Sequence, residues 1–243
     1  MAPVPSVPGL VVRPVDSDFE MDAVRRLHAE CYLAAGYVLP EEVDHNGYID
    51  DPWVPYSDYF AAHDTTAGDE IVGTCRIIRP SVRGFPAFQE TQTSADALAV
   101  FSRLDPSLCV EVSALATPRV GAQNMAISAA LYGLVWQESL RSGRAYMLAV
   151  MDNRLLRIMR RWFDFPFEAL GESSLYMGSM STPVSMYLPR TIEVLNTSNP
   201  EALAFFSGDI PFDQLNDIAI DLRGRVPEHR SNVIPLPSNR AAT

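Results

Sequence analysis

The sequence contains no lysine, so all 19 of its basic residues are arginine. This absence excludes the enzyme classes that depend on a lysine side chain: P-loop nucleotide hydrolases, protein kinases and enzymes that bind pyridoxal phosphate as a Schiff base. The 30 acidic residues outnumber the arginines and give a formal charge of -11 at pH 7. Such an excess of acid disfavours binding to nucleic acid and to anionic membrane surfaces.

Cysteine is scarce as well, with three residues far apart in the sequence and no CxxC pair. This pattern is typical of reduced thiols and gives no support to a structural zinc site, so we expect no metal. The sequence also lacks a run of about 18 apolar residues and a basic segment followed by an apolar one at its beginning. We therefore expect a soluble, cytoplasmic protein without a transmembrane segment.

Several motifs of common enzyme classes are missing. There is no GxSxG, HExxH, GxGxxG or calcium-loop pattern, and the four histidines show no spacing typical of metal ligands. The sequence thus gives no support to hydrolases of the GxSxG type, to zinc proteases or to dinucleotide-binding enzymes.

The pattern of apolar residues predicts one domain at residues 10–224 between flexible, proline-rich tails at 1–9 and 225–243. A strand at 10–15 precedes a helix capped by Asp16 or Ser17, and an acidic, aromatic loop follows at 40–59. Later strands are predicted at 59–63, 70–79, 109–117 and 146–150, with a loop at 118–124 and helices after that loop and after Asn153. Late strands follow at 167–170, 175–177 and 184–188. One helix is predicted to start at 199–201, and a last one carries an apolar stripe over 212–222. This order predicts an α/β fold of the α+β type, with a mixed, largely antiparallel sheet flanked by helices.

Four segments, RRLHAECYLAAGYVLPEE, SDYF, IVGTCRIIRP and VEVSALATPR, occur in this order between residues 25 and 119. Together they resemble the acyl-homoserine-lactone synthases and the related N-acyl amino acid synthases, a branch of the GNAT acyltransferase fold. The resemblance extends over residues 13–188. It implies a sheet that opens between its fourth and fifth strands, and an acyl donor carried on phosphopantetheine, as acyl carrier protein or acyl-CoA, with no tightly bound cofactor.

The resemblance also implies positions for the site residues. Asp51 corresponds to the acid of the loop, Arg76 to the arginine of the GxxR pattern, and Glu111 and Ser113 to the ExS strand. His28 stands where the family commonly has an arginine on the first helix. Ala114 likewise stands where the family commonly has an arginine after the serine.

The residue types and their positions also suit the attack of an amine on a thioester, without reference to the family. Glu111 and Ser113 share one face of a strand, and Glu111 can accept the proton of an attacking amine. With the resemblance added, Arg76 is its orienting partner and a clamp for the acid group of the acceptor, and Asp51 is a contact for the ammonium; without it, Asp50 and Asp51 are expected to be turn residues of the loop. Backbone N–H groups after Ser113 can hold the oxyanion, and the following loop can hold phosphate oxygens. The residues predicted to contact the donor are Leu115, Ala116, Thr117, Arg119, Gly121, Gln123, Asn124 and Met125.

Other interpretations remain open at this stage. Glu111 and Arg76 can form an ion pair that only orients the sheet, and the other site residues can have purely structural roles. The function that we expect is transfer of an acyl group, favouring long chains, to the amine of an amino acid or similar small amine. An acetyl-CoA-dependent N-acetyltransferase and a non-catalytic module of the same fold that binds a ligand are the alternatives.

Six of the arginines lie between residues 141 and 161. A solvated helix face with intrahelical pairs accounts for such a cluster. Acyl carrier proteins are acidic, however, so an acidic enzyme that uses one needs a local basic patch. Arg154, Arg157 and Arg161 are therefore predicted to contact the carrier.

Overall fold

The computed structural model describes residues 8–118 and 121–226. Its strands form one mixed sheet in the order β1-β2-β3-β4-β5-β8-β6, with β7 paired to β8. Strands β4 and β5 run parallel, and the other pairs described here are antiparallel. The predicted fold class is confirmed. The strands are β1 (Leu10–Pro14), β2 (Ser57–Asp64), β3 (Glu70–Ile78), β4 (Cys109–Ala116), β5 (Tyr146–Asp152), β6 (Glu168–Ala169), β7 (Ser174–Tyr176) and β8 (Ser179–Tyr187).

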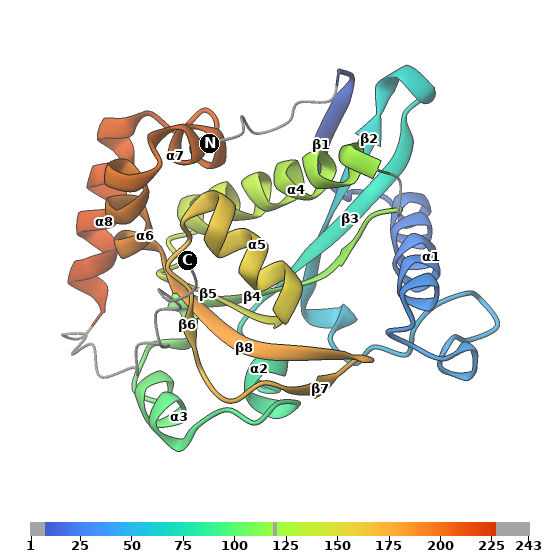
Figure 1. Ribbon diagram of the computed structural model, residues 1–243, viewed down its shortest axis with the longest axis horizontal. Helices are drawn as coiled ribbons and strands as arrows, with labels where there is room; N and C mark the ends of the chain where they lie inside the picture. The colour runs from blue at the N-terminus through green and yellow to red at the C-terminus, as the bar shows by residue number, and fades with distance from the viewer. Residues whose placement is uncertain (1–7, 119–120, 227–243) are drawn as a thin grey trace, which may run out of the picture.

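Helices cover both faces of this sheet (Figure 1). In the view of Figure 1, β3 rises between α4 on its left and α1 on its right, while α5 lies in front of β5 and α2 and α3 lie below β8. The last three helices pack together at the far left. The helices are α1 (Asp18–Ala35), α2 (Pro86–Gln89), α3 (Ala95–Phe101), α4 (Gly121–Arg141), α5 (Asn153–Phe163), α6 (Leu188–Ser198), α7 (Pro200–Ser207) and α8 (Phe212–Arg225).

The first helix begins at one of its two predicted caps and ends at a glycine. The Ser17 side chain accepts a hydrogen bond from the backbone N–H of Glu20, as an N-cap does, and Gly36 ends the helix with a φ of 72°. Glycine tolerates this left-handed conformation without steric cost. These caps fix the length of α1 and the point at which the acidic loop leaves it.

The buried face of the fifth helix agrees only in part with the sequence-based expectation. Its periodicity predicts that Leu155, Ile158, Met159 and Trp162 face inward. Met159 is buried and Leu155 is half-buried, but Ile158 and Trp162 are each 40% exposed, and the buried stripe instead includes Leu156 and Phe163. Helix α5 lies against β5 and β8 at the surface of the molecule, so its inward stripe is narrow. The prediction was therefore wrong for the outer two residues.

Other differences concern element boundaries. The predicted loop at 118–124 is shorter in the structure, since α4 begins at Gly121, and α2, α3 and α6 had no counterpart in the sequence-based pattern. Helices α2 and α3 are of only four and seven residues, too short to show a helical period. Of the predicted tails, residues 1–7 and 227–243 lie outside the described part of the chain; α8 continues to Arg225. Among the described residues, no helix is long and apolar enough to cross a membrane.

Candidate active site

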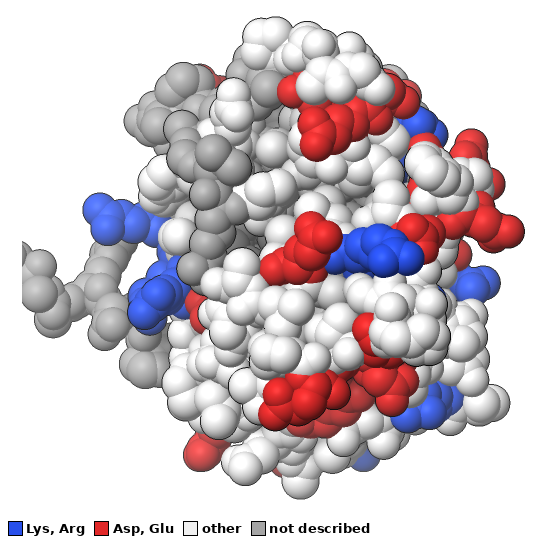
Figure 2. Space-filling view, turned by 90° about the vertical axis from the view of Figure 1, so that its right-hand side faces the viewer, with Lys and Arg blue, Asp and Glu red and all other residues white. Residues whose placement is uncertain are grey.

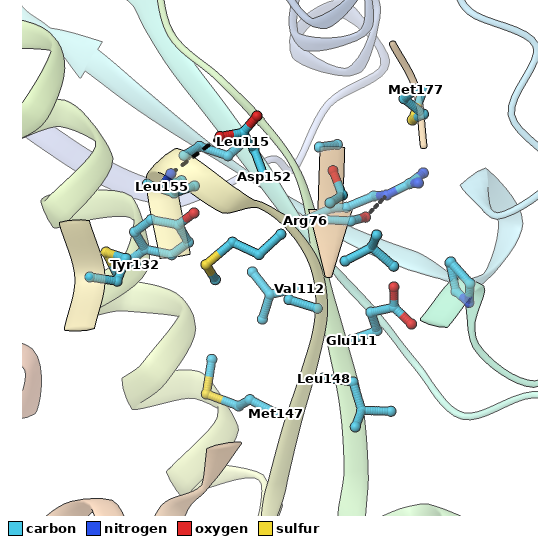
Figure 3. Close-up of a pocket in the computed structure, with 18 of the residues that line it drawn as sticks. Arg76, Glu111, Val112, Leu115, Tyr132, Met147, Leu148, Asp152, Leu155 and Met177 are labelled. Atoms are coloured by element: carbon cyan, nitrogen blue, oxygen red, sulfur yellow. Dashed lines mark hydrogen bonds between the residues drawn. The ribbon is translucent and has the colours of Figure 1, made fainter. Parts of the chain in front are cut away.

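A cavity opens where β4 and β5 part. The two strands are paired only at Cys109–Tyr146, Val110–Met147 and Glu111–Leu148, although both continue beyond these positions. Residues 112–115 of β4 and 149–152 of β5 then line a cavity of about 280 Å³ (Figure 3). The divergence of two parallel strands thus produces the opening that the resemblance implied.

A β-bulge lies on the same stretch of β4. Arg76 on β3 is opposite Ser113, but Thr74 is opposite Ala116, so two residues of β4 stand against one of β3. Ala114 has a left-handed backbone with a φ of 52°, and Leu115 lines the cavity. A bulge leaves one residue out of the hydrogen-bonded ladder. The regular pairing of β3 and β4 is therefore interrupted beside the cavity.

Glu111 is completely buried in the wall of this cavity. Its Oε2 accepts a hydrogen bond of 2.9 Å from the backbone N–H of Ala87, and its Oε1 has no hydrogen-bond partner within the described residues. Burial raises the pKa of Glu111 to about 8, an effect that the Ala87 N–H and the charge of Arg76 reduce and the nearby Glu90 carboxylate increases. A carboxyl group with such a pKa exchanges its proton near neutral pH.

Arg76 pairs with Asp51 and not with Glu111. Its Nη1 lies 2.5 Å from Asp51 Oδ2, its Nε donates to Ser113 Oγ at 2.8 Å, and its Nη1 donates to the hydroxyl of Tyr59 at 3.2 Å. Among the described residues there is no ion pair between Arg76 and Glu111. The register explains this, since Glu111 is opposite Ile78, two residues further along β3. The expected cross-strand pair of Glu111 and Arg76 is thus replaced by a pair with the loop acid.

His28 reaches the cavity from α1. It is buried, its ring packs edge-on against Tyr32 at 4.1 Å between centroids, and its Nε2 has no hydrogen-bond partner among the described residues. Burial and the charge of Arg76 lower the pKa of His28 to about 3. The imidazole is therefore neutral at physiological pH. The structure brings all five predicted catalytic residues together, with Asp51 joined to the cavity wall through Arg76.

The other end of the cavity is apolar, and it was not predicted from the sequence. Its walls combine side chains from helices and strands that are far apart in the chain, so no local pattern reveals them. They include Tyr132, Trp136, Met147, Met159, Phe165, Phe167, Met186 and Phe206. The cavity therefore joins a polar end, at Glu111, to a lining of aromatic and methionine side chains.

A hairpin turn between β7 and β8 completes the wall on the side of α1. Tyr176 and Met177 line the cavity, and Gly178, with a φ of 68°, lies so close to the end of α1 that an added Cβ would stand 2.3 Å from the carbonyl oxygen of Gly36. Only glycine permits this approach. Tyr176 was not predicted as a site residue, and a lone tyrosine in a short strand gives no signal that would have found it.

Among the predicted donor-binding residues whose side chains the structure describes, Leu115 alone lines the cavity. Ala116 is buried, and the Thr117 hydroxyl donates to Asn124 Oδ1, which ties the end of β4 to the first turn of α4. Gly121 is the first residue of that helix, Gln123 is exposed and Met125 is half-buried. Arg119 lies outside the described residues.

The three predicted carrier contacts share the outer face of α5. Arg154, Arg157 and Arg161 are exposed, and none of them forms an ion pair with another described residue. Ile158 and Trp162, the two outward apolar residues, are on the same short helix. We call these five residues the α5 face. The intrahelical pairs that would neutralise its arginines are not present in the described structure.

The described residues contain no group of three or more histidine, cysteine, aspartate or glutamate side chains placed to hold a metal ion.

Comparison with known proteins identifies the fold. No protein-family model matches the sequence. No curated protein matches it either.

Among solved structures, FeeM, an N-acyl amino acid synthase from uncultured soil microbes, is 19% identical, with a TM-score of 0.56 over 77% of this chain and 96% of its own. BjaI, a CoA-dependent acyl-homoserine lactone synthase solved with MTA, is 15% identical, with a TM-score of 0.60 over 88% of this chain and 99% of its own. The acyl-homoserine lactone synthase LasI is 12% identical, with a TM-score of 0.55 over 73% of this chain and 89% of its own. The chain thus has the GNAT-like fold of the acyl-homoserine lactone and N-acyl amino acid synthases.

Proposed function

We propose that this protein transfers an acyl group from a phosphopantetheine thioester to the primary amine of a small acceptor such as an amino acid. The observation that carries the proposal is the cavity between β4 and β5, which joins the buried carboxyl group of Glu111 to an apolar lining. An acyl chain fits the apolar part, and its thioester carbonyl then lies beside the polar end. The shared fold with acyl-transferring synthases supports the same function.

In the proposed reaction the amine nitrogen attacks the thioester carbonyl carbon. Glu111, as the carboxylate, accepts the proton that the nitrogen loses. The carbon–sulfur bond of the tetrahedral intermediate then breaks, and the thiolate leaves and takes up a proton. The products are an amide and a free thiol. A proton acceptor with a pKa of about 8 is matched to this task, because it is both basic enough to take the proton and ionised in part at neutral pH.

The oxyanion of the intermediate needs a donor that is already in place. The bulge at Ala114 and Leu115 is suited to this role, because its backbone departs from the β3–β4 ladder beside the cavity. Arg76 and Asp51 bring a fixed positive and negative charge to the same end, and Arg76 orients Ser113. Neutral His28 offers its ring nitrogen to the acceptor. These roles make the polar end an acceptor site.

The pantetheine arm of the donor would lie along the junction of β4 and α4. There the bond between Thr117 and Asn124 fixes the strand end against the helix start. Backbone N–H groups at a helix N-terminus bind phosphate oxygens well. One structure of BjaI was solved with SAM and isopentyl-CoA. For the present chain we favour long acyl chains, because the apolar lining far exceeds what an acetyl group needs.

An acyl carrier protein is the proposed source of the acyl group, and the α5 face is its docking site. Acidic side chains outnumber basic ones on the face of the molecule that Figure 2 shows. Exposed acids on α1 and the following loop include Glu30, Glu41, Glu42, Asp44 and Asp50. An acidic carrier is repelled by such a surface and attracted by three unpaired arginines. Leu155 and Met159, on the other side of α5, line the cavity, so a carrier bound there is close to the acyl site.

Thiol release tests the proposed function directly. The purified protein is supplied with a mixture of amino acids and with acetyl-CoA, a long-chain acyl-CoA or a long-chain acyl carrier protein, and the products are identified by mass. We expect release with the long-chain donors only, together with an N-acyl amino acid. The Glu111→Gln variant serves as the control, since it keeps the shape of the side chain and cannot accept the proton.

Two results would contradict the proposal. Release from acetyl-CoA alone would make the protein an ordinary N-acetyltransferase. The second is that no donor releases thiol, although circular dichroism shows that the protein is folded. That result would favour a module that binds a ligand without turning it over.

A further inference from the structure

Glu90 joins three separate segments of the chain at the polar end of the cavity. It is the C-cap residue of α2 and is exposed to solvent. Its Oε1 accepts a hydrogen bond of 2.6 Å from the indole nitrogen of Trp53, and its Oε2 accepts one of 2.8 Å from the hydroxyl of Tyr176. Trp53 is buried in the loop after α1, and Tyr176 forms part of the cavity wall. Both carboxylate oxygens of a surface residue are thus bound, one by the buried Trp53 and the other by the half-buried Tyr176.

The same short helix also holds the candidate proton acceptor. The backbone N–H of Ala87, in the first turn of α2, donates to Glu111 Oε2. Glu111 and Tyr176 are therefore attached to the two ends of one four-residue helix. A displacement of α2 moves both of them.

From Trp53 the hydrogen bonds continue to the ion pair. The backbone N–H of Trp53 donates to Asp51 Oδ1 at 2.8 Å, and Asp51 Oδ2 pairs with Arg76. Arg76 in turn donates to Ser113 on β4, two residues after Glu111. Hydrogen bonds and one ion pair thus connect Glu111 to Ser113 on the same strand, by way of α2, the loop after α1 and β3.

We propose that Glu90 is a positioning residue for acyl transfer, which holds Tyr176 and the Asp51 loop in place so that the acceptor amine meets Glu111 in the reactive geometry. The inference rests on the proposed function. Glu90 lies outside the cavity wall, and it acts through residues that are part of that wall. Neither the family resemblance nor the sequence pattern assigns it a role.

The charge of Glu90 gives the proposal a second consequence. The groups that face Glu111 are Arg76 with its partner Asp51 from β3 and the loop, Glu90 from α2, Tyr176 from β7 and His28 from α1. Of these, Glu90 is the negative charge that carries no cationic partner among the described residues. Its removal lowers the pKa of Glu111, since a nearby like charge disfavours ionisation.

Two substitutions separate geometry from charge. Glu90→Gln removes the charge and keeps the length of the side chain: its oxygen can accept from Trp53, and its NH₂ can donate to the Tyr176 hydroxyl. Glu90→Ala removes both hydrogen bonds. Glu70→Gln is the matched control, because Glu70 is an exposed glutamate at the start of β3, at the end remote from Arg76.

Steady-state kinetics with the amine as the varied substrate give the first result. We expect Glu90→Ala to raise KM for the amine about tenfold or more, the loss expected for hydrogen bonds to a charged group, with KM for the acyl donor unchanged. Glu90→Gln should keep both KM values within about twofold and move the pH profile of kcat to lower pH. Equal changes of both KM values in Glu90→Ala would indicate a merely structural residue and overturn the proposal.

A measurement that needs no turnover distinguishes failure of this inference from failure of the proposed function. The titration of Glu111 is followed by ¹³C NMR of labelled glutamate carboxyl carbons, with the resonance assigned through Glu111→Gln. We expect Glu111 to titrate at lower pH in Glu90→Gln than in the wild type and in Glu70→Gln. An identical titration in all three proteins would overturn the coupling between Glu90 and Glu111, even if the protein transfers no acyl group.

Discussion

The Nη1 of Arg76 and the Oδ2 of Asp51 lie 2.5 Å apart, and their side chains are only 6% and 12% exposed. This pair sets the charge balance of the polar end of the cavity. Because Asp51 already compensates the guanidinium, Arg76 stabilises ionised Glu111 only in part, and burial keeps the pKa of Glu111 high. The same pair anchors the loop after α1 to β3.

Breaking this ion pair should be costly for the fold. Arg76→Ala leaves the Asp51 carboxylate almost buried without its partner, so we expect the free energy of unfolding to fall by about 3 to 5 kcal/mol in urea titrations. The double variant Arg76→Ala with Asp51→Asn should lose clearly less than the sum of the two single variants, because the two residues act as a unit. Additive losses would show that the pair contributes nothing beyond its separate contacts.

The activity of the wild type should rise with pH through about 8. Glu111 accepts a proton in the proposed reaction, so only its ionised form is productive, and that form becomes the major one above its pKa of about 8. The profile of kcat against pH, recorded with a saturating long-chain donor, checks this. A profile that is flat from pH 6 to 9, with chemistry as the slow step, would exclude Glu111 as the proton acceptor.

Stability should depend on pH in the opposite direction. The pKa of Glu111 is about 8 in the folded protein and 4.5 for an unperturbed glutamate, so between these values the folded state holds a proton that the unfolded state has released. The stabilisation due to this group is fully present below pH 4.5 and is lost as pH rises to about 8. The wild type should therefore lose stability relative to Glu111→Gln across this window, with a slope approaching about 1.4 kcal/mol per pH unit.

The apolar lining should set the preferred length of the acyl chain. Trp136→Leu removes an indole from the cavity wall, and the enlarged cavity should raise kcat/KM for longer acyl-CoA substrates relative to shorter ones. Trp162→Leu is the matched control, because Trp162 lies on the outer side of α5. An unchanged ratio in Trp136→Leu would place the acyl chain elsewhere.

The sheet could be predicted from the sequence because its strands carry local patterns. The alternation in residues 109–117 located β4 and placed Glu111 and Ser113 on one face, and the apolar run at 146–150 located β5. The partner of Arg76 could not be predicted, because it depends on the register between β3 and β4 and on a loop that is held through Trp53. Nor could the bulge at Ala114, since alanine rarely adopts a left-handed backbone and gives no sign of one.

The lining of the acyl cavity also could not be predicted from the sequence. Trp136, Met186 and Phe206 come from α4, β8 and α7, and each fits its own local pattern as an ordinary core residue. They become a cavity lining only because β4 and β5 diverge after Glu111 and Leu148. The divergence is a property of the assembled sheet, so the resemblance to known synthases could imply it and the residues alone could not.

A charge reversal on the α5 face should weaken the use of acyl carrier protein as donor and leave the use of acyl-CoA unchanged. Arg157→Glu reverses one of its three exposed charges, so it should raise KM for acyl carrier protein several-fold by slowing association, and leave KM for the corresponding acyl-CoA unchanged. Arg103→Glu, an equal change of net charge at an exposed position after α3, is the control and should leave both values unchanged. The effect of Arg157→Glu should also shrink as salt is raised, because exposed charges are screened. An equal loss with both donors would mean that α5 acts through the cavity wall that Leu155 and Met159 form, and that the carrier docks elsewhere.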